Sequence, residues 1–181
     1  MLLNADRSLV LVVDMQARLA PSIERFEQVE ASAAWVLEVA TELAVPVWAT
    51  EQYPRGLGST VDRLARLIPA GHVLEKNHFG ALEEPGIADR LQALGRRQIV
   101  VLGTEAHVCV LQTAIGLLES GYETFVVAEA VGSRSPDNKQ LALSRMSRAG
   151  VQVVSREMLA FEWLERAGTD IFRRISRRWI R

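Results

Sequence analysis

The stretch LVLVV, residues Leu9–Val13, with Asp14 directly after it, decides the fold of this 181-residue chain. Continuous apolar runs rich in valine, without polar alternation, are typical of strands buried on both faces, as in a parallel sheet. Five further runs follow, the last of them weaker: Val45–Thr50, Ile99–Leu102, Phe125–Ala128, Val151–Val154 and His72–Lys76. The sequence therefore predicts a sheet of buried parallel strands.

Helix-length segments lie between these runs. Three of them carry apolar residues at helical spacing or throughout: Phe26–Leu43, Ala88–Leu94 and Cys109–Leu118. A fourth has its own start and stop signals, with Ser135 as the expected N-cap, Pro136 at the first helical position and Gly150 past the end. Strands alternating with helices predict a doubly wound α/β sheet in a single domain, residues 1–181.

The overall composition argues against several partners. Lysine and arginine number 21 and aspartate and glutamate 22, so a net charge of −1 attracts neither nucleic acid nor an anionic membrane. The N-terminal stretch carries Asp6 and Asp14 before and inside an apolar run too short to cross a bilayer, which is unlike a signal peptide. The single cysteine, Cys109, cannot form a disulfide within the chain. We therefore expect a reduced, cytoplasmic protein without nucleic-acid or membrane partners.

The tail DIFRRISRRWIR, residues 170–181, combines a helical apolar face with five arginines. Ile171, Ile175 and Trp179 share that face, which predicts a helix docked on the domain with solvated arginines outside. A subunit contact is the second interpretation. Nucleic-acid binding is a weak third, because no second basic cluster extends the patch.

Three chemically useful side chains follow predicted strands. Asp14, Lys76 and Cys109 each have an ordinary interpretation alone: a helix cap, a surface lysine and a buried core residue. Because the carboxyl ends of parallel strands meet at one edge of a sheet, we expect all three to converge there. A lysine and a helix N-terminus favour a thiolate, and an aspartate can take and return the thiol proton. The trio predicts an amide-hydrolysing nucleophile that needs no histidine, with the Cys109 N–H stabilising an oxyanion.

A nucleotide-binding function is not supported. No G-x-G-x-x-G pattern follows Leu9–Val13, and the glycines Gly56 and Gly58 lack the residues of a phosphate loop. A redox role for Cys109 stays open, although the chain has no second cysteine to resolve a sulfenic acid.

Several segments, in order, resemble the isochorismatase-like cysteine hydrolase family, in particular its isochorismatase domain-containing branch of unassigned substrate. The segments are VVDMQ, TEQYPRGLGST, EKNHFGA, GTEAHVCVLQTA, VVAEAVGSRSPDNKQLALSRM and AGVQVVSREMLAFEWLERAG. The resemblance implies a three-layer Rossmann-like fold with a six-stranded parallel sheet and helices on both faces. It also implies a catalytic triad of Asp14, Lys76 and Cys109, a cis peptide between Thr104 and Glu105 beside the oxyanion, and a homodimer or larger homo-oligomer.

Two departures from the family narrow the expected activity. Nicotinamidases of the family carry an Asp-x-His metal motif after the second strand, where this chain reads TEQYPRGLG. We therefore expect no metal and no cofactor. Isochorismatases proper tend to lack the cysteine, so Cys109 argues against isochorismate as substrate. The predicted function is hydrolysis of a small amide, carbamoyl or related acyl substrate through a Cys109 thioester; the alternative is a binding or scaffold protein with a vestigial site.

Supporting roles are less specific. Gln16 is expected to hold Asp14 by a hydrogen bond, or else simply to start a loop. Leu19, Tyr53 and Phe79 are candidates for an apolar substrate-binding wall, with core or interface positions an equal alternative. Three further polar residues, His78, His107 and Arg134, have both a structural and a functional interpretation. For His107 and His78 the structural interpretation is favoured, and for Arg134 an ion pair with Glu105 or Glu129 is preferred to contact with a substrate carboxylate.

Overall fold

The computed structural model describes residues 1–180 and contains one six-stranded sheet with strand order β3-β2-β1-β4-β5-β6. All neighbouring strands pair in parallel. The strands are β1 Ser8–Val13, β2 Val47–Gln52, β3 Val73–Lys76, β4 Gln98–Thr104, β5 Glu123–Gly132 and β6 Gln152–Val154. Each of the six predicted runs overlaps one of these strands, so the predicted parallel sheet is confirmed. The prediction that all strands are buried is wrong for the edge strands β3 and β6, because each has a neighbour on one side only.

Eight α-helices surround the sheet in the described part of the chain. They are α1 Phe26–Glu42, α2 Pro54–Leu57, α3 Asp62–Ala65, α4 Ile87–Ala93, α5 Leu111–Glu119, α6 Pro136–Ala149, α7 Arg156–Leu164 and α8 Asp170–Ile175. The predicted boundaries of α6 are confirmed, because the Ser135 hydroxyl accepts the Asn138 N–H and Gly150 ends the helix with a φ of 110°.

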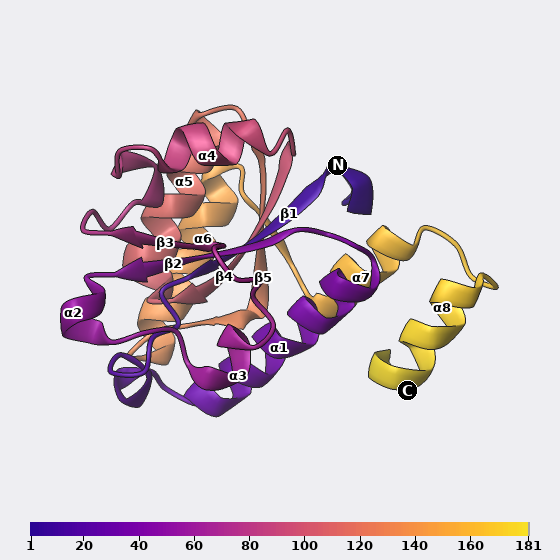
Figure 1. Cartoon of the computed structure of the whole chain (residues 1–181), viewed down its shortest axis with the longest axis horizontal. Helices are drawn as coiled ribbons and strands as arrows, with labels where there is room; N and C mark the ends of the chain where they lie inside the picture. Colours follow the sequence, from indigo (N-terminus) through magenta and orange to yellow (C-terminus); the bar gives the residue numbers. More distant parts are fainter. Residues whose placement is uncertain (181) are drawn as a thin grey trace.

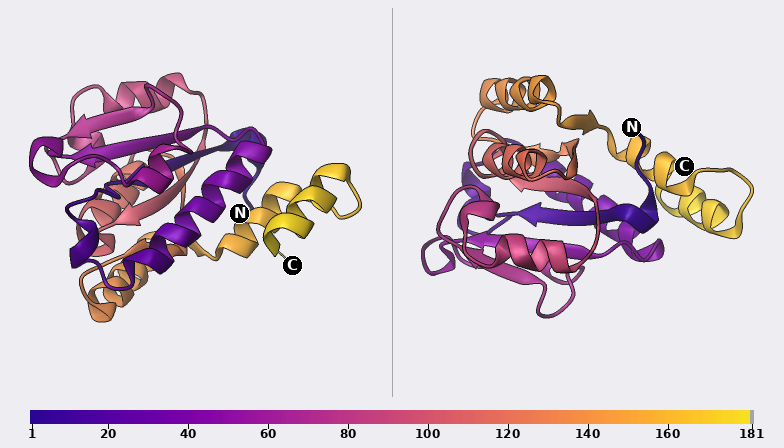
Figure 2. Two further views of the ribbon diagram at one scale, coloured as in Figure 1. Left: turned by 60° about the horizontal axis from the view of Figure 1, so that its bottom comes forward. Right: turned by 90° about the horizontal axis from the view of Figure 1, so that it is seen from above.

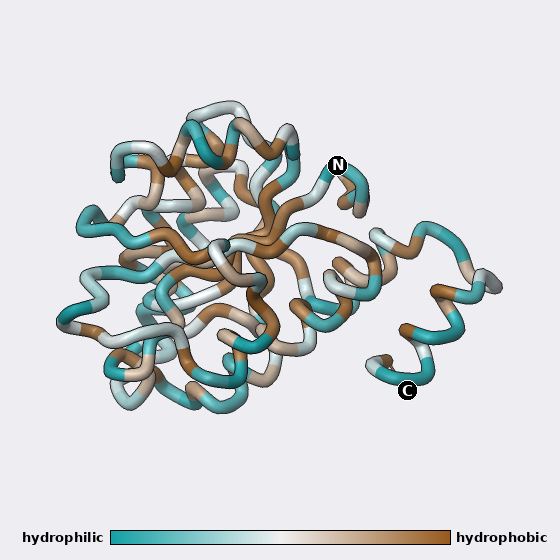
Figure 3. Tube along the Cα trace, viewed as in Figure 1, coloured by the Kyte–Doolittle hydropathy of each residue, from teal (hydrophilic) through white to brown (hydrophobic). Residues whose placement is uncertain are grey.

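The helices form two layers, one on each face of the sheet (Figures 1 and 2). Helices α1, α3, α7 and α8 enclose one apolar core with the sheet, and α4, α5 and α6 enclose the other. Apolar residues concentrate along the central strands between the layers, as the hydropathy trace in Figure 3 shows. The predicted three-layer Rossmann-like architecture is therefore present. Within residues 1–180, no helix is both long and apolar enough to span a membrane.

The direction of winding reverses between two neighbouring strands at the centre of the sheet. After β1 the chain passes to α1 on one face, and after β4 it passes to α5 on the other. In such sheets the divergence of the two connections leaves a crevice beyond the carboxyl ends of the strands. Asp14 follows β1 and Cys109 follows β4, so both lie at this reversal point.

The C-terminal tail docks on its own chain, as its apolar stripe predicted. Ile175 is fully buried and Trp179 packs against the core that contains α1. The Trp179 indole N–H donates to a carboxylate oxygen of Glu38 at 2.6 Å, and its carbonyl accepts from Trp35 at 2.8 Å. Of the five tail arginines, Arg181 lies outside the described residues.

The segment around Cys109 differs from the expected regular helix. A π-helical turn, Ala106–Val110, comes first, and α5 begins only at Leu111. Cys109 therefore lies inside a π-turn between β4 and α5. Such turns place one extra residue in the helical path, and they occur frequently at functional sites.

Candidate active site

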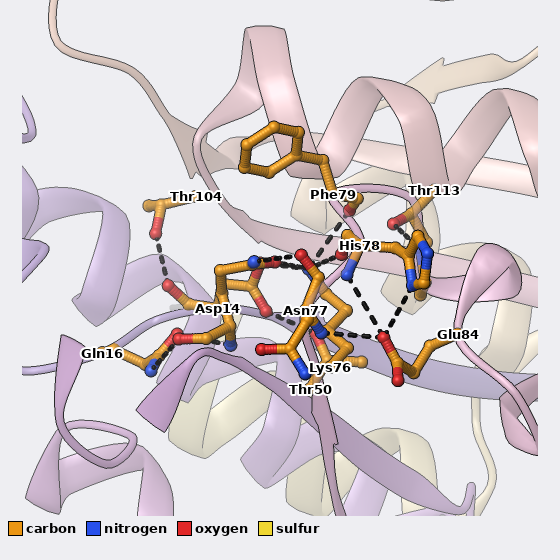
Figure 4. Close-up of polar contacts among 12 residues, drawn as sticks. Asp14, Gln16, Thr50, Lys76, Asn77, His78, Phe79, Glu84, Thr104 and Thr113 are labelled. Atoms are coloured by element: carbon orange, nitrogen blue, oxygen red, sulfur yellow. Dashed lines mark hydrogen bonds and ion pairs between the residues drawn. The ribbon is translucent and has the colours of Figure 1, made fainter. Parts of the chain in front are cut away.

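Asp14 is held at the end of β1 by its backbone and by both carboxylate oxygens. Its φ of 51° is in the left-handed region, which aspartate adopts more readily than most residues. The side chain is fully buried, with Oδ1 accepting from the Thr50 hydroxyl at 2.7 Å and Oδ2 from the Lys76 ammonium at 2.7 Å (Figure 4). The carboxylate is thus fixed in orientation and paired with a cation.

Lys76 ends the edge strand β3 and is itself buried, with a residue exposure of 1%. Its Nζ donates to Asp14, to Gln52 Oε1 at 2.6 Å and to the carbonyls of His78 and Phe79 at 3.2 and 3.1 Å. A buried ammonium is tolerated only where its charge is paired and its N–H groups are bonded, and both conditions are met here.

Thr50 and Gln52 complete this network and were not among the predicted site residues. They are two positions apart on β2, so both reach the same side of the strand, one toward Asp14 and the other toward Lys76. The parallel register places Thr50 opposite Val13 and Gln52 opposite Lys76. The sequence feature that could have identified Thr50 and Gln52 is the presence of polar residues in the run that forms β2, whose six positions are all buried.

Cys109 is 6% exposed and lies against this pair. Burial is the largest of several effects that raise the pKa of its thiol to about 12, and the negative charge of Asp14 comes next. The positive charge of Lys76 lowers the same pKa, as predicted, but by less. The three predicted residues are therefore brought together, and the thiol is protonated because burial and the charge of Asp14 outweigh the effect of Lys76.

The turn that precedes Cys109 is tied to Asp14 by its backbone. The Thr104 hydroxyl donates to the Asp14 carbonyl at 2.7 Å, and the peptide bond between Thr104 and Glu105 is cis, at the position that the family resemblance implies. Gly103 allows the close approach of the two strands, because a Cβ there would lie 2.0 Å from the Val13 carbonyl oxygen.

Glu105 anchors the π-turn on both sides of the nucleophile candidate. Its carbonyl accepts the N–H groups of Val108 at 3.0 Å and Val110 at 3.2 Å. Its carboxylate binds Arg134 through two contacts of 2.5 and 3.3 Å. The preferred ion pair of Arg134 with Glu105 is therefore confirmed.

Gln16 is hydrogen-bonded to Asp14 through its backbone, since its N–H donates to the Asp14 carbonyl at 3.0 Å. Its side-chain amide binds elsewhere: it donates to the carbonyls of Gln52 and Gly58, at 3.0 and 2.6 Å, and accepts the Gln52 N–H at 2.8 Å. The side chain is fully buried and spans the gap between the loop after β1 and the end of β2. Gln16 thus supports the site indirectly, because it holds Gln52, which in turn accepts a hydrogen bond from Lys76.

The apolar wall candidates divide into two groups. Leu19 is buried, at 7% exposure, whereas Tyr53 and Phe79 are exposed at 56% and 53%. Tyr53 lines a cavity of about 410 Å³ beside the end of β3. The Phe79 ring points away from the polar cluster in Figure 4, although its carbonyl binds Lys76. Their assignment to substrate binding stays a prediction.

His78 and His107 each contact one nearby side chain. His107 Nδ1 lies 3.0 Å from the Ser133 hydroxyl, and His78 Nδ1 lies 2.9 Å from a Glu84 oxygen. Bonds from the Asn77 backbone, and then from His78, hold the pKa of Glu84 at about 2. Among the residues described, no cluster of three or more histidine, cysteine, aspartate or glutamate side chains could hold a metal ion.

A parallel α/β sheet whose reversal point carries a buried carboxylate, a buried ammonium and a thiol defines a hydrolase-like fold with a candidate nucleophile. Residues 8–158 match the model of the isochorismatase domain, and the chain belongs to that family.

Relatives and solved structures agree with this assignment. The chain is 37% identical over 149 residues to isochorismatase domain-containing protein 1 of Salmo salar, covering 82% of this chain and 52% of the relative, so it spans about half of that relative's length. It superposes on the MAR1 ribonuclease of Caenorhabditis elegans with a TM-score of 0.90 at 30% identity, covering 98% and 91% of the two chains. The YcaC gene product of Escherichia coli, described as an octameric hydrolase of unknown specificity, shares the fold with a TM-score of 0.91 at 22% identity, covering 99% and 91%.

Proposed function

We propose that this protein is a cysteine hydrolase that cleaves a C–N bond in a small amide, carbamoyl or related acyl substrate. The observation that carries the proposal is the convergence of the Cys109 thiol with a buried Asp14 carboxylate that Thr50 and Lys76 fix and whose charge raises the pKa of that thiol. A carboxylate base beside a nucleophile is the arrangement that activated-nucleophile chemistry requires.

In the proposed first half-reaction, Cys109 Sγ attacks the substrate carbonyl carbon while Asp14 takes the thiol proton. A thiol with a pKa of about 12 needs this concerted transfer, because almost no thiolate exists at neutral pH. The carbonyl oxygen becomes an oxyanion, for which the N–H groups of Glu105 and Cys109 are the proposed donors. Collapse of the tetrahedral intermediate breaks the C–N bond, and Asp14 returns its proton to the departing amine.

In the second half-reaction, water attacks the thioester with Asp14 as the base. The C–S bond breaks, the sulfur recovers its proton and the carboxylic acid is released. Lys76 keeps its hydrogen bonds throughout and offsets the charge of Asp14 whenever that carboxylate is ionised. Its proposed role is therefore to keep Asp14 ionised and oriented between the two transfers.

A release assay with a trapping step tests this function. Wild-type protein and Cys109→Ala are compared for ammonia or amine release across a panel of small amides and carbamoyl compounds, and acid-quenched samples are analysed by mass spectrometry. We expect release by the wild type alone, with an acyl adduct on Cys109. Equal behaviour of the two proteins across the panel would reject the hydrolase and favour a scaffold of the same fold.

The ribonuclease description belongs to the Caenorhabditis elegans relative, and we do not extend it to this chain. The formal net charge is −1, and the candidate site contains one buried cation that is already paired. Phosphodiester binding draws its affinity from unpaired Lys and Arg groups. We therefore propose a small neutral acyl substrate.

Association of this chain into a homodimer or larger assembly is part of the proposal. The octameric description of the Escherichia coli protein and the exposed aromatic rings of Tyr53 and Phe79 support it. Sedimentation at micromolar concentration is expected to show a dimer or larger species, and a monomer there would contradict it.

A further inference from the structure

A second cavity, of about 470 Å³, lies away from the Asp14–Lys76–Cys109 cluster. It opens beyond the carboxyl end of β5, where the N-terminal turns of α1, α6 and α7 come together, and we name it the α1–α6 cavity. It is linked to the candidate active site through Ser133, which lines the cavity and bonds His107 of the π-turn, and through Gly132, which pairs with Thr104. The catalytic proposal does not use this cavity.

Two cations of the α1–α6 cavity, Lys139 and Arg156, have no carboxylate partner in the described part of the chain, whereas both of its carboxylates have contacts. Glu24 lies 3.9 Å from Arg25, and Glu129 accepts the Arg156 backbone N–H at 3.3 Å. Within residues 1–180, neither the Lys139 ammonium nor the Arg156 guanidinium has a carboxylate within 4.0 Å. The Arg156 guanidinium instead lies over the Trp35 ring, 5.3 Å from its centroid.

Lys139 is unusual because it is partly buried without an ion pair. Burial lowers its pKa, and the more distant charges of Glu129 and Glu24 act in the opposite direction. A partly desolvated ammonium that faces a cavity gains from a bound anion, since the anion replaces lost hydration.

The Ser32 hydroxyl adds a hydrogen-bonding group to this cavity. Ser32 is 8% exposed, lines the cavity from α1 and makes no side-chain hydrogen bond within the described chain. Its hydroxyl oxygen is accessible rather than buried, so it can donate a hydrogen bond to an anion held by the two cations.

The start of α1 adds a favourable field for negative charge. This helix has 17 residues, and its N-cap residue, Arg25, makes no side-chain capping bond. The unsatisfied N–H groups at such a helix start carry a partial positive charge and bind oxyanions. Arg25 and Gln28, in the first turn, line the cavity.

We propose that the α1–α6 cavity binds a small oxyanion, a phosphate or carboxylate group, through Lys139, Arg156 and the Ser32 hydroxyl. The volume accommodates a small metabolite that carries such a group, since typical ligand pockets have about 300–1,000 Å³. The site is separate from the proposed hydrolytic chemistry and does not depend on it.

Isothermal titration with inorganic phosphate and with succinate tests the site directly. Sodium chloride keeps the ionic strength constant, and the variants are Lys139→Gln, Ser32→Ala and the control Arg148→Gln. Arg148 lies in the last turn of α6, so its substitution removes the same charge from the same helix outside the cavity. We expect saturable one-site binding by the wild type and by Arg148→Gln. The two cavity variants should bind at least about tenfold more weakly, the loss of one charge-assisted hydrogen bond.

The two anions distinguish the sources of the recognised group. Saturation by phosphate alone assigns the site to phosphate-bearing ligands, saturation by succinate alone to carboxylates, and saturation by both to oxyanions in general. Absence of saturable binding by the wild type would overturn the proposal, as would equal weakening in all three variants, which indicates only ionic screening. If Lys139→Gln does not fold, as judged by its thermal unfolding, Ser32→Ala alone decides.

Discussion

At the scale of single residues, two opposite charges act on the Cys109 thiol, and that of Asp14 has the larger effect. The carboxylate raises the pKa of the thiol more than the ammonium of Lys76 lowers it. Together with burial, the largest cause, this leaves a neutral thiol beside an ion pair, and the proposed reaction depends on proton transfer to Asp14. A site of this design is protected from indiscriminate alkylation, since the thiolate is the species that alkylating agents attack.

The substitution Asp14→Asn is expected to separate alkylation from turnover. Loss of the negative charge lowers the pKa of Cys109, so iodoacetamide should label the cysteine faster than in the wild type at pH 8. Hydrolysis should fall by about 10²–10⁴, because the general base is gone. Mass spectrometry of timed samples measures the labelling, and release assays measure the turnover.

The matched control for this substitution is Asp170→Asn. The Asp170 side chain is 87% exposed and pairs only with Arg173 in its own helix, so both rates should stay at the wild-type values. Unchanged or slower labelling of Asp14→Asn, with a cooperative thermal transition, would contradict the assigned charge effect.

The raised pKa of Cys109 also predicts how stability changes with pH. The thiol pKa is about 12 in the folded chain against an ordinary value of 9.0, so the unfolded chain loses the proton first as the pH rises. The contribution of Cys109 to the free energy of unfolding is then constant below pH 9 and decreases above it, by at most about 1.4 kcal/mol per pH unit. The variant Cys109→Ala lacks this slope.

Urea unfolding of wild type and Cys109→Ala at pH 8 and at pH 10 measures the effect. All other titrating groups are shared, so they cancel in the difference between the two proteins. We expect the difference, wild type minus variant, to be smaller at pH 10 than at pH 8. A difference that is constant or larger at pH 10 would show that the folded thiol has an ordinary or lowered pKa.

The site residues that could be predicted are those that end a strand. Asp14, Lys76 and Cys109 follow apolar runs, and parallel topology alone brings such ends together. Thr50 and Gln52 could not be assigned, because the partner of a strand side chain depends on a register that composition does not reveal. The protonation of Cys109 was also out of reach, since it depends on which of two charges has the larger effect at a buried sulfur.

At the scale of elements, the central strands were predictable because they are buried and therefore continuously apolar, whereas the edge strand β3 is buried only at its last residue and gave the weakest run. The short helices α2 and α3, of four residues each, have no periodicity to detect. The predicted helix Cys109–Leu118 includes only the last two residues of the π-turn Ala106–Val110. The turn could not be detected, because the segment is apolar nearly all round and an inserted residue leaves no visible break in it. It is the closeness of β1 and β4 that positions this turn over Asp14.

Gly103→Ala tests that closeness. The glycine has a φ of 132°, and an added Cβ would meet backbone atoms of Val13 at 2.0 to 2.7 Å, which cannot move without shifting β1. We expect a loss of about 3 kcal/mol in the free energy of unfolding together with loss of hydrolysis, measured by urea denaturation and by amine release.

Gly116→Ala is the matched control for this substitution. Gly116 lies in α5, and the nearest atom to an added Cβ is 4.0 Å away, an ordinary contact. Because alanine has the higher helix propensity, stability should rise by up to about 1 kcal/mol. If the free energy of unfolding of Gly103→Ala is no lower than that of the wild type, as expected for this control, then β4 does not lie as close to β1 at Val13 as the structure has it.

At the scale of the whole molecule, the last residues of the chain complete the core on the α1 face. The segment after α8 reaches back to α1, where Trp179 exchanges hydrogen bonds with Glu38 and Trp35. The apolar stripe predicted this docking, but its two polar contacts depend on the position of α1 and could not be predicted. Ile175 is buried by this docking, whereas Ile171 and Trp179 are half-buried, and a subunit contact of the tail stays a prediction.

Trp179→Ala is expected to destabilise the folded chain by about 1–3 kcal/mol, since it removes a partly buried ring and leaves Glu38 without its indole partner. Trp179→Phe keeps an aromatic ring and loses only the indole N–H, so its cost should be smaller, about 1 kcal/mol. The control Arg177→Ala changes an exposed residue of the same segment and should stay within about 0.5 kcal/mol of the wild type. Urea denaturation of the four proteins gives the comparison. Equal stability of Trp179→Ala and Arg177→Ala would show that the tail does not dock on α1 in solution.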